Sequence, residues 1–452
     1  MWLLAHGIVG RADIPIPIFW FAVAAAVVLV ASFLALAAGW SRPRLERVPE
    51  RPLLRIPIAI EVLLGAVGVF VFAVVAYAGL AGTDSQPDNL APTAVYVGFW
   101  VGVPFATLLF GDVFRLLSPW RAIGRAIGFA AGRVARGAMP EPLPYPERLG
   151  HWPAAAGLVA FAICELCWAA GRDPAPLAVL MLVYLAIQLV GMSLYGVEPW
   201  TRRGDAFGVW FGLLARLAPL GRRADGRLVL RPPVLGATGL VAGAGTTAVL
   251  LVAIGSTAFD GAKEGPLFND MVGGLQDAFT GLGASQGLGL ELGFVVGLAL
   301  SVAVVTAVWT VGVLGMPRRE LRMSRRELGR RFAHTLIPIA AAYLVAHYFS
   351  LLVYSGQSLW RLASDPLGDG SDLFGGSTSR IDYSVVSATG IWWVQIAALV
   401  VGHVAALVLA HDRALAVYGT ARSATRSQVV MLLVMVVFTV LGIALLSEAL
   451  NQ

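Results

Sequence analysis

Four polar residues recur at helical spacing inside one long apolar segment. Tyr343, His347, Ser350 and Tyr354 are separated by four, three and four positions, so one face of a helix would carry all of them. Such a stripe can line a cavity in which protons are bound or transferred. It can equally supply the hydrogen bonds that join one membrane helix to its neighbours.

A carboxylate in another apolar segment is expected at the same depth as this stripe. Glu165 and His347 lie about six and seven residues from the same end of their segments, at about 1.5 Å of helix per residue. A carboxylate and an imidazole at one level can pass a proton or bind a divalent metal ion. We therefore take His347 and Glu165 as candidate catalytic and metal-binding residues, with Tyr343 and Tyr354 as catalytic candidates beside them.

A second polar layer is expected nearer the opposite membrane face. Glu61, Gln188 and His403 each lie roughly five to eight residues from the corresponding ends of their segments. Two stacked polar layers are typical of a transporter or a proton channel. Haem held by histidines of neighbouring helices is an alternative, but His347 and His403 differ in expected depth by ~8 Å, which argues against one haem between them.

Signatures of soluble enzymes are missing from the sequence. It contains no P-loop, nucleophile elbow, HExxH or dinucleotide fingerprint. Its two cysteines, Cys164 and Cys167, fall in one apolar segment. They are expected to be small packing residues, with a thiolate metal site or redox pair as the alternative.

The segments that carry these residues are long enough to cross a lipid bilayer. Of the 452 residues, 58% are hydrophobic and 13% are charged, against roughly a quarter charged in soluble domains. A spanning helix needs about 20 apolar residues. The sequence therefore predicts an all-α transmembrane bundle, with residues 1–452 forming a single integral membrane domain. Its ten expected spans are 15–40, 56–81, 92–112, 152–171, 175–196, 234–257, 288–314, 332–354, 387–411 and 428–448.

Basic residues are concentrated in alternate loops. Twenty-eight of the 33 Lys and Arg residues lie in five loops, namely 41–55, 113–151, 197–233, 315–331 and 412–427. The positive-inside rule places these loops in the cytoplasm and both termini outside. The net charge of +6 is thus a topological signal and does not indicate nucleic-acid binding. The expected partner is the lipid bilayer, and the expected location is the plasma membrane.

Two of the basic loops resemble each other. PWRAIGRAIG at 119–128 and PWTRRGDAFG at 199–208 share five residues at a constant offset, which suggests a parallel repeat of 56–128 and 152–208. Both continue as amphipathic stretches, with aromatic residues such as Phe207 and Trp210 at helical spacing among arginines. This pattern predicts helices that lie in the cytoplasmic interface, with their rings toward the acyl chains.

The two larger loops on the other side are acidic. Residues 258–287 include Asp260, and residues 355–386 include Asp382 in a stretch rich in Gly and Ser. Solvated acidic loops are expected, and a site for a hard cation such as Ca²⁺ is the alternative.

Several stretches resemble a group of actinobacterial polytopic membrane proteins commonly named fenitrothion hydrolase. They are AHTLIPIAAAYLVAHYFSLLVYSGQ at 333–357, ASDPLGDGSDLFG, IWWVQIAALVVGHVAALVLAHDRAL at 391–415, the N-terminal AHGIVGRADIPIP, and PWRAIGRA. The resemblance covers nearly the whole chain, and it implies hydrolysis of an organophosphate triester.

Hydrolysis of that kind suits an outward-facing polar chamber. A metal-bound water at His347, with Glu165 or Asp382 as further ligand, would attack phosphorus, because a metal lowers the pKa of its water toward neutrality. His403 is a further candidate ligand, and a divalent metal ion is the cofactor that this mechanism would use. Two other functions stay open. One is a proton-coupled transporter, and the other is a non-catalytic or redox subunit of a larger membrane complex or homo-oligomer.

Overall fold

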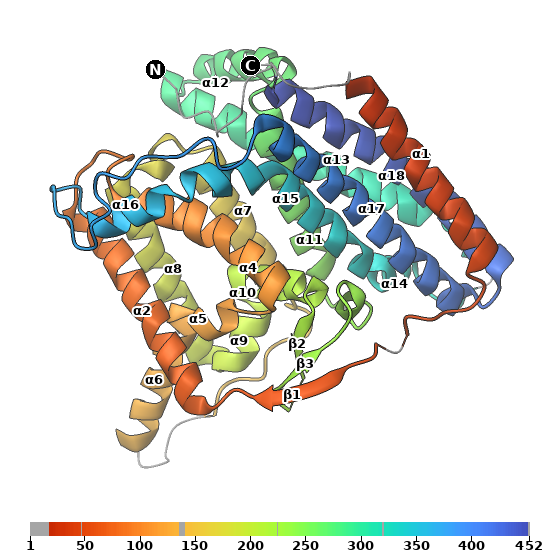
Figure 1. Cartoon of the computed structure of the whole chain (residues 1–452), viewed down its shortest axis with the longest axis horizontal. Helices are drawn as coiled ribbons and strands as arrows, with labels where there is room; N and C mark the ends of the chain where they lie inside the picture. The colour runs from red at the N-terminus through yellow and green to blue at the C-terminus, as the bar shows by residue number, and fades with distance from the viewer. Residues whose placement is uncertain (1–17, 47, 135–140, 224, 319–320, 451–452) are drawn as a thin grey trace.

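The chain folds mainly into helices, as the computed structural model shows (Figure 1). The structure describes residues 18–46, 48–134, 141–223, 225–318 and 321–450. Within these ranges, eight helical segments are long and apolar enough to cross a membrane. They are α1 (Ile18–Gly39), α2 (Ile58–Ala81), the run of α3 (Leu90–Thr93), π-helical η2 (Ala94–Gly102) and α4 (Val103–Phe110), α8 (Pro174–Tyr195), α13 (Gln286–Leu314), α14 (Arg325–Phe332) continuing through the 3-10 turn η6 (Ala333–Thr335) into α15 (Leu336–Ser355), α17 (Ala388–Tyr418) and α18 (Ala421–Leu450). The expectation of a multi-pass helical membrane protein is confirmed at this level.

Two of the ten expected spans form shorter helices. α7 (Trp152–Leu166) has 15 residues and α11 (Thr246–Ala262) has 17. The span expected at 234–257 is wrong at its beginning, because α11 starts only after Gly245, which has a positive φ. The preceding residues are rich in glycine, which makes a helix there costly. α11 also continues beyond residue 257 and so takes in Asp260.

The connections contain further short elements. The helices are α5 (Phe114–Leu117), α6 (Pro119–Val134), α9 (Val197–Arg203), α10 (Ala206–Leu214), α12 (Pro266–Gly281) and α16 (Ser358–Ser364), and the 3-10 turns are η3 (Ala169–Arg172), η4 (Ala215–Leu217) and η5 (Leu235–Ala237). The strands β1 (Arg51–Arg55), β2 (Leu220–Arg222) and β3 (Arg227–Leu230) form one antiparallel sheet in the order β1–β3–β2. This small sheet is an addition to the expected all-α bundle, and it forms because the two basic loops pair their backbone groups with each other.

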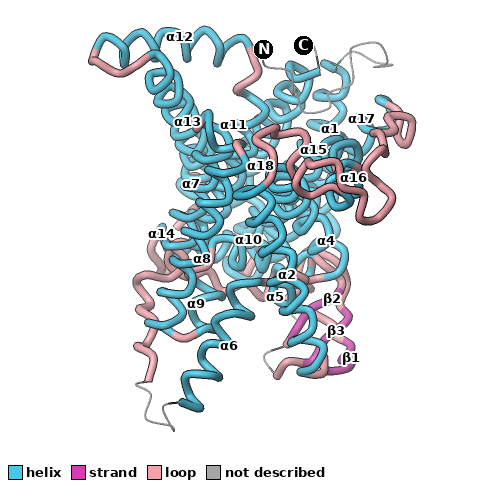
Figure 2. Tube along the Cα trace, turned by 90° about the vertical axis from the view of Figure 1, so that its left-hand side faces the viewer, coloured by secondary structure: helices cyan, strands magenta, loops and turns pink. Residues whose placement is uncertain are grey.

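The connections gather at two ends of the helical bundle. Figure 2 shows α12 toward one end, and β1–β3, α6 and α9 toward the other. We call these the α12 end and the sheet end. The expected acidic loop 258–287 is largely helical, since α12 occupies most of it. The orientation of the two ends across a membrane stays a prediction.

The interfacial helices divide into two kinds. α6 is amphipathic and leaves Ile127 and Phe129 exposed, as expected for a helix at a lipid surface. The aromatic residues of α10 are instead buried in the protein, with Phe207 and Trp210 at 5% and 2% exposure. The expectation that they face acyl chains is therefore wrong. Helical periodicity marks an apolar face, but it does not say whether protein or lipid covers that face.

A clamp holds the segment after α1 against α17. The carboxylate of Asp412 accepts hydrogen bonds from the Trp40 indole at 3.1 Å, from the Arg44 backbone N–H at 2.6 Å and from the Leu45 backbone N–H at 3.1 Å. The neighbouring His411 donates from Nε2 to the Trp40 carbonyl at 2.9 Å. The chain leaving the first helix is thus fixed before it crosses to β1.

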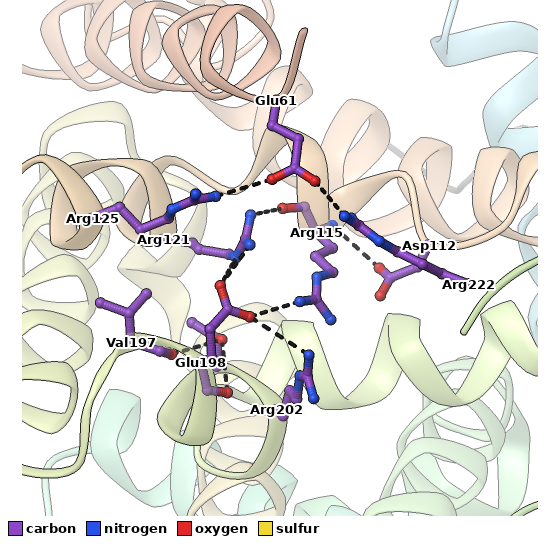
Figure 3. A network of polar contacts seen from close by, with 10 residues as sticks. Glu61, Asp112, Arg115, Arg121, Arg125, Val197, Glu198, Arg202 and Arg222 are labelled. Carbon is purple, nitrogen blue, oxygen red and sulfur yellow. Dashed lines mark hydrogen bonds and ion pairs between the residues drawn. The ribbon is translucent and has the colours of Figure 1, made fainter. Parts of the chain in front are cut away.

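An ion-pair network joins the helices of the sheet end (Figure 3). Glu198 of α9 accepts from Arg115 Nη2 at 2.7 Å, and from Arg121 Nη2 at 2.6 Å and Nε at 3.0 Å. Glu61 of α2 pairs with Arg125 of α6 at 3.1 Å and with Arg222 of β2. The network therefore ties α2, α5, α6, α9 and the sheet into one body.

Glu198 owes its charged state to the arginines around it. Burial works to raise the pKa of its carboxyl, but the charges of Arg121 and Arg115 outweigh burial and hold the pKa below the ordinary value of 4.5. The ionised form is thus favoured more in the folded protein than in the unfolded chain. Its contribution to stability is present at neutral pH and is lost as the pH falls through the folded pKa.

We predict that Glu198→Gln lowers the free energy of unfolding by about 1–3 kcal/mol at pH 7, because the buried Arg121 loses a charged partner. The wild type should lose this advantage over the variant as the pH falls below about 4.5. Unfolding followed by tryptophan fluorescence in detergent measures both effects. Glu327→Gln, whose half-exposed partner is Arg331, is the control and should cost roughly 0.5 kcal/mol or less. Equal losses in the two variants at pH 7 would contradict the assignment.

Candidate functional site

A buried charged group in the helical bundle centres on Asp260. Its side chain is only 1% exposed. One oxygen, Oδ2, lies 2.8 Å from His347 Nε2 and accepts from the Tyr348 hydroxyl at 3.0 Å. The other oxygen, Oδ1, lies 2.9 Å from Lys263 Nζ. We call Asp260, Lys263, His347 and Tyr348 the Asp260 cluster.

Two helices position the cluster. Asp260 and Lys263 are three residues apart at the end of α11, so they share one face of that helix. His347 and Tyr348 follow each other on α15, and their ring centroids are 4.6 Å apart with an edge-to-face tilt. Gly261 lies against the imidazole, because a Cβ there would be 3.6 Å from His347 Cε1 and 3.7 Å from Nδ1. At these distances even a Cβ at 261 would make only an ordinary van der Waals contact with the ring.

The hydrogen bonds assign the protons of the cluster. A carboxylate can only accept, so Nε2 of His347 and the Tyr348 hydroxyl must donate. Asp260 and Lys263 are a pair of opposite charges and neutralise each other. With its proton on Nε2, a neutral His347 carries a lone pair on Nδ1. The cluster therefore combines a carboxylate, an amine and an imidazole that can each change charge by one proton.

Glu165 lies in the same electrostatic neighbourhood but is not the partner of His347. Its side chain, on α7, is 8% exposed and interacts electrostatically with Asp260, Lys263 and Arg172. His347 pairs with Asp260 instead, which corrects the expected His347–Glu165 pair. Sequence reasoning found the helix and the depth, but it placed Asp260 in a solvated loop.

A π-helical segment packs beside this neighbourhood. η2 carries Tyr96, whose hydroxyl donates to the Gly171 carbonyl at 2.6 Å, and Trp100, whose ring lies 4.6 Å from that of Phe161 on α7. η2 also contacts α15. π-helical turns are rare and are frequently found at functional sites.

Three predicted site residues lie away from the cluster and bond to backbone groups. The Tyr343 hydroxyl donates to the Phe438 carbonyl of α18 at 3.1 Å, and the Tyr354 hydroxyl donates to the Val386 carbonyl at 2.8 Å. Asp382 is exposed and accepts from the backbone N–H of Ser384 at 2.8 Å. Hydrogen bonds from Ser384 lower the pKa of Asp382. The two tyrosines thus join segments, as the alternative interpretation of the stripe proposed.

The second polar layer does not form. Glu61 belongs to the ion pairs of the sheet end, and Gln188 accepts from the Trp200 indole at 2.8 Å. His403 is fully buried on α17 near Tyr343, with ring centroids 6.2 Å apart. Such a layer forms only if the helices that carry the three residues are neighbours. Counting residues along single helices does not show which helices are neighbours.

The described residues include no group of three or more His, Cys, Asp or Glu side chains arranged to hold a metal ion. At the cluster, Asp260 and His347 supply two such groups, and the positive Lys263 lies beside them. Cys164 and Cys167 are free thiols of α7 and the turn after it.

Lys263 and Tyr348 were missed at the sequence level together with Asp260. One signal was present, because an Asp and a Lys three residues apart directly follow an apolar stretch, a spacing that forms an ion pair on a helix. Comparison of the chain with protein-family models, with curated proteins and with solved structures gives no match.

We predict that Asp260→Asn lowers the free energy of unfolding by about 3 kcal/mol, because it leaves Lys263 buried without a counter-charge. The double change Asp260→Asn with Lys263→Met should recover more than half of that loss, since no charge is then stranded. Thermal unfolding in detergent measures both proteins. Asp270→Asn in exposed α12 is the matched control and should change little. A double variant less stable than Asp260→Asn would show that the pair does not act as a unit.

Proposed function

We propose that this protein is a proton-linked transporter of the plasma membrane and that the Asp260 cluster is its proton-binding site. The observation that carries the proposal is a carboxylate, an amine and an imidazole in direct contact inside a helical membrane bundle. Ionisable groups in such a place are costly, and they usually serve ion or proton movement. The ten spans and the outward orientation of both termini form part of the same proposal.

Protonation can change the structure at this point. The charges of Asp260 and Lys263 cancel while both are ionised. A proton that reaches the carboxylate removes its charge, so Lys263 loses its counter-charge and His347 is left with a neutral and weaker acceptor. Because an unpaired buried ammonium is strongly disfavoured, Lys263 must then give up its proton or move toward water. A change of that kind couples proton binding to a shift of α11 against α15.

We predict that vesicles containing the purified protein take up protons when a pH gradient is imposed, with a pH-sensitive dye inside as the reporter. Asp260→Asn and His347→Gln should each reduce the rate by about tenfold or more, a change equivalent to about 1.4 kcal/mol on the barrier. Asp270→Asn is the matched control and should keep the wild-type rate. Proton uptake that is equal in all four proteins, or equal to that of empty vesicles, would refute the proposal.

Hydrolysis of an organophosphate triester is a second candidate, favoured by the contact between Asp260 and His347. A carboxylate that accepts from one imidazole nitrogen orients the ring and leaves the other nitrogen as a general base. In this mechanism Nδ1 of His347 takes a proton from water, the water oxygen bonds to phosphorus, and the aryloxide leaves with the electron pair of its bond. The resemblance to proteins named fenitrothion hydrolase supports this candidate.

We predict, for this second candidate, that the purified protein releases the aryl alcohol from fenitrothion and that His347→Ala reduces the rate by about a hundredfold, a typical contribution of a general base. The assay is run with a chelator and again with added Zn²⁺, which separates a direct base from a metal-bound water. Asp382→Ala is the control, since Asp382 lies outside the cluster. An unchanged rate in His347→Ala would exclude the cluster from hydrolysis.

A further inference from the structure

One buried face of α17 carries three polar atoms without a hydrogen-bond partner among the residues that the structure describes. They are Trp392 Nε1, Gln395 Oε1 and His403 Nε2, whose side chains belong to residues that are 3%, 7% and 0% exposed. The intervals of three and eight residues keep all three on the same side of the helix. They extend over ~16 Å of helix length. We call them the α17 row.

Unsatisfied polar atoms are rare in protein interiors, because each forfeits the hydrogen bond that water would supply. One such atom costs roughly 1–3 kcal/mol, so three on a single face need a common explanation. Bound water is the usual one, since buried waters occupy polar sites and make several hydrogen bonds there. A donor, an acceptor and an imidazole along one line are the groups that a file of water would meet.

Nε2 of His403, one of the three atoms of the α17 row, carries a lone pair. Its Nδ1 lies 2.8 Å from the Leu399 carbonyl, which can only accept, so Nδ1 carries the proton. Nε2 is then the free acceptor of a neutral ring. Close packing fixes its position, because a Cβ on the neighbouring Gly402 would lie 2.4 Å from the Cβ of Ala342 on α15. The ring is thus held in place with its basic nitrogen in the bundle interior.

The row lies near both the proposed proton site and the sheet end. Tyr343 packs 6.2 Å from His403, measured between ring centroids, and His347 follows Tyr343 by one helical turn on α15. In the other direction, His411 lies eight residues further along α17, and its Nδ1 accepts from Gln428 Nε2 at 3.1 Å. Gln428 Oε1 is a further buried atom without a partner among the described residues. Polar atoms therefore continue from the level of the Asp260 cluster toward the sheet end.

We propose that the α17 row lines a water-filled path through the bundle and that His403 is a proton-accepting station on it. In each passage Nε2 takes a proton from a water on one side and returns that proton to a water on the other side, while the Nδ1–H bond to Leu399 stays intact. No bond other than O–H and N–H changes, and no second reactant is needed. The role of His403 as a station rests on the proposed function, whereas the presence of water does not.

Hydroxyl-radical footprinting of the purified protein tests the water directly. Radicals formed from water bound inside a protein oxidise the side chains next to it. We expect Trp392 and His403 to be oxidised at least about threefold faster than Trp120, although all three are at least nine-tenths buried. Trp120 sits on α6, and its Nε1 donates to Asp205 at 2.7 Å, so it needs no water. Oxidation of Trp392 and His403 no faster than of Trp120 would overturn the path.

Proton uptake into vesicles tests the station. His403→Phe should reduce the rate by about tenfold, while Trp210→Phe should keep it. Trp392→Phe removes the indole N–H together with the five-membered ring but retains an aromatic side chain, so it serves where His403→Phe fails to fold. It should slow both the proton uptake and the oxidation of His403. A wild-type rate in both row variants would overturn the station. If the wild type carries no protons but the row is oxidised as expected, the proposed function and the station fail and the water-filled path stands.

Discussion

The burial of one negative charge, that of Asp260, constrains the rest of the bundle. A carboxylate away from water must be paired and hydrogen-bonded or it will not stay ionised. Its donors come from α11 itself and from α15, so the contact fixes the rotation and height of one helix against the other. Gly261 lies beside the His347 ring, at a distance where a Cβ would make an ordinary contact. Helix packing here follows from the need to satisfy a charge.

The second charged region, at the sheet end, obeys the same rule but has a different chemistry. Glu61 and Glu198 are surrounded by arginines, and an arginine keeps its proton at any physiological pH. That network is suited to holding α2, α6 and α9 together and is poorly suited to handling protons. The Asp260 cluster has lysine, histidine and tyrosine instead of arginine. The choice of cation thus separates a static clamp from a site that can change its charge.

Hydropathy predicted most of the helices, because it follows from local composition. It failed where the composition of a segment and its packing in the bundle disagree. The run of apolar residues ends before Asp260, and for this reason the sixth span was expected to end there. The helix instead continues to Ala262, and Asp260 forms an ion pair with Lys263. His347 was identified from the spacing of polar residues on its own helix. Its partner lies on another helix, and the sequence of one segment does not show which helices are adjacent. The prediction for the aromatic face of α10 was wrong for a related reason. An apolar helix face can pack against protein or against lipid, and the sequence pattern is the same in both cases.

The geometry around His347 also separates the two candidate functions. A triester must bring its phosphorus, which carries three ester oxygens and a fourth substituent, within reach of a water activated by the basic nitrogen, and Nδ1 is the nitrogen that Asp260 leaves free. That edge of the ring lies against Gly261, at 3.7 Å from the position of a Cβ, and the side chain is 18% exposed. Hydrolysis would need room there for a water and for the phosphorus of the triester behind it, beside a largely buried side chain. A proton needs only one water beside the ring, and for this reason the packing favours proton transfer.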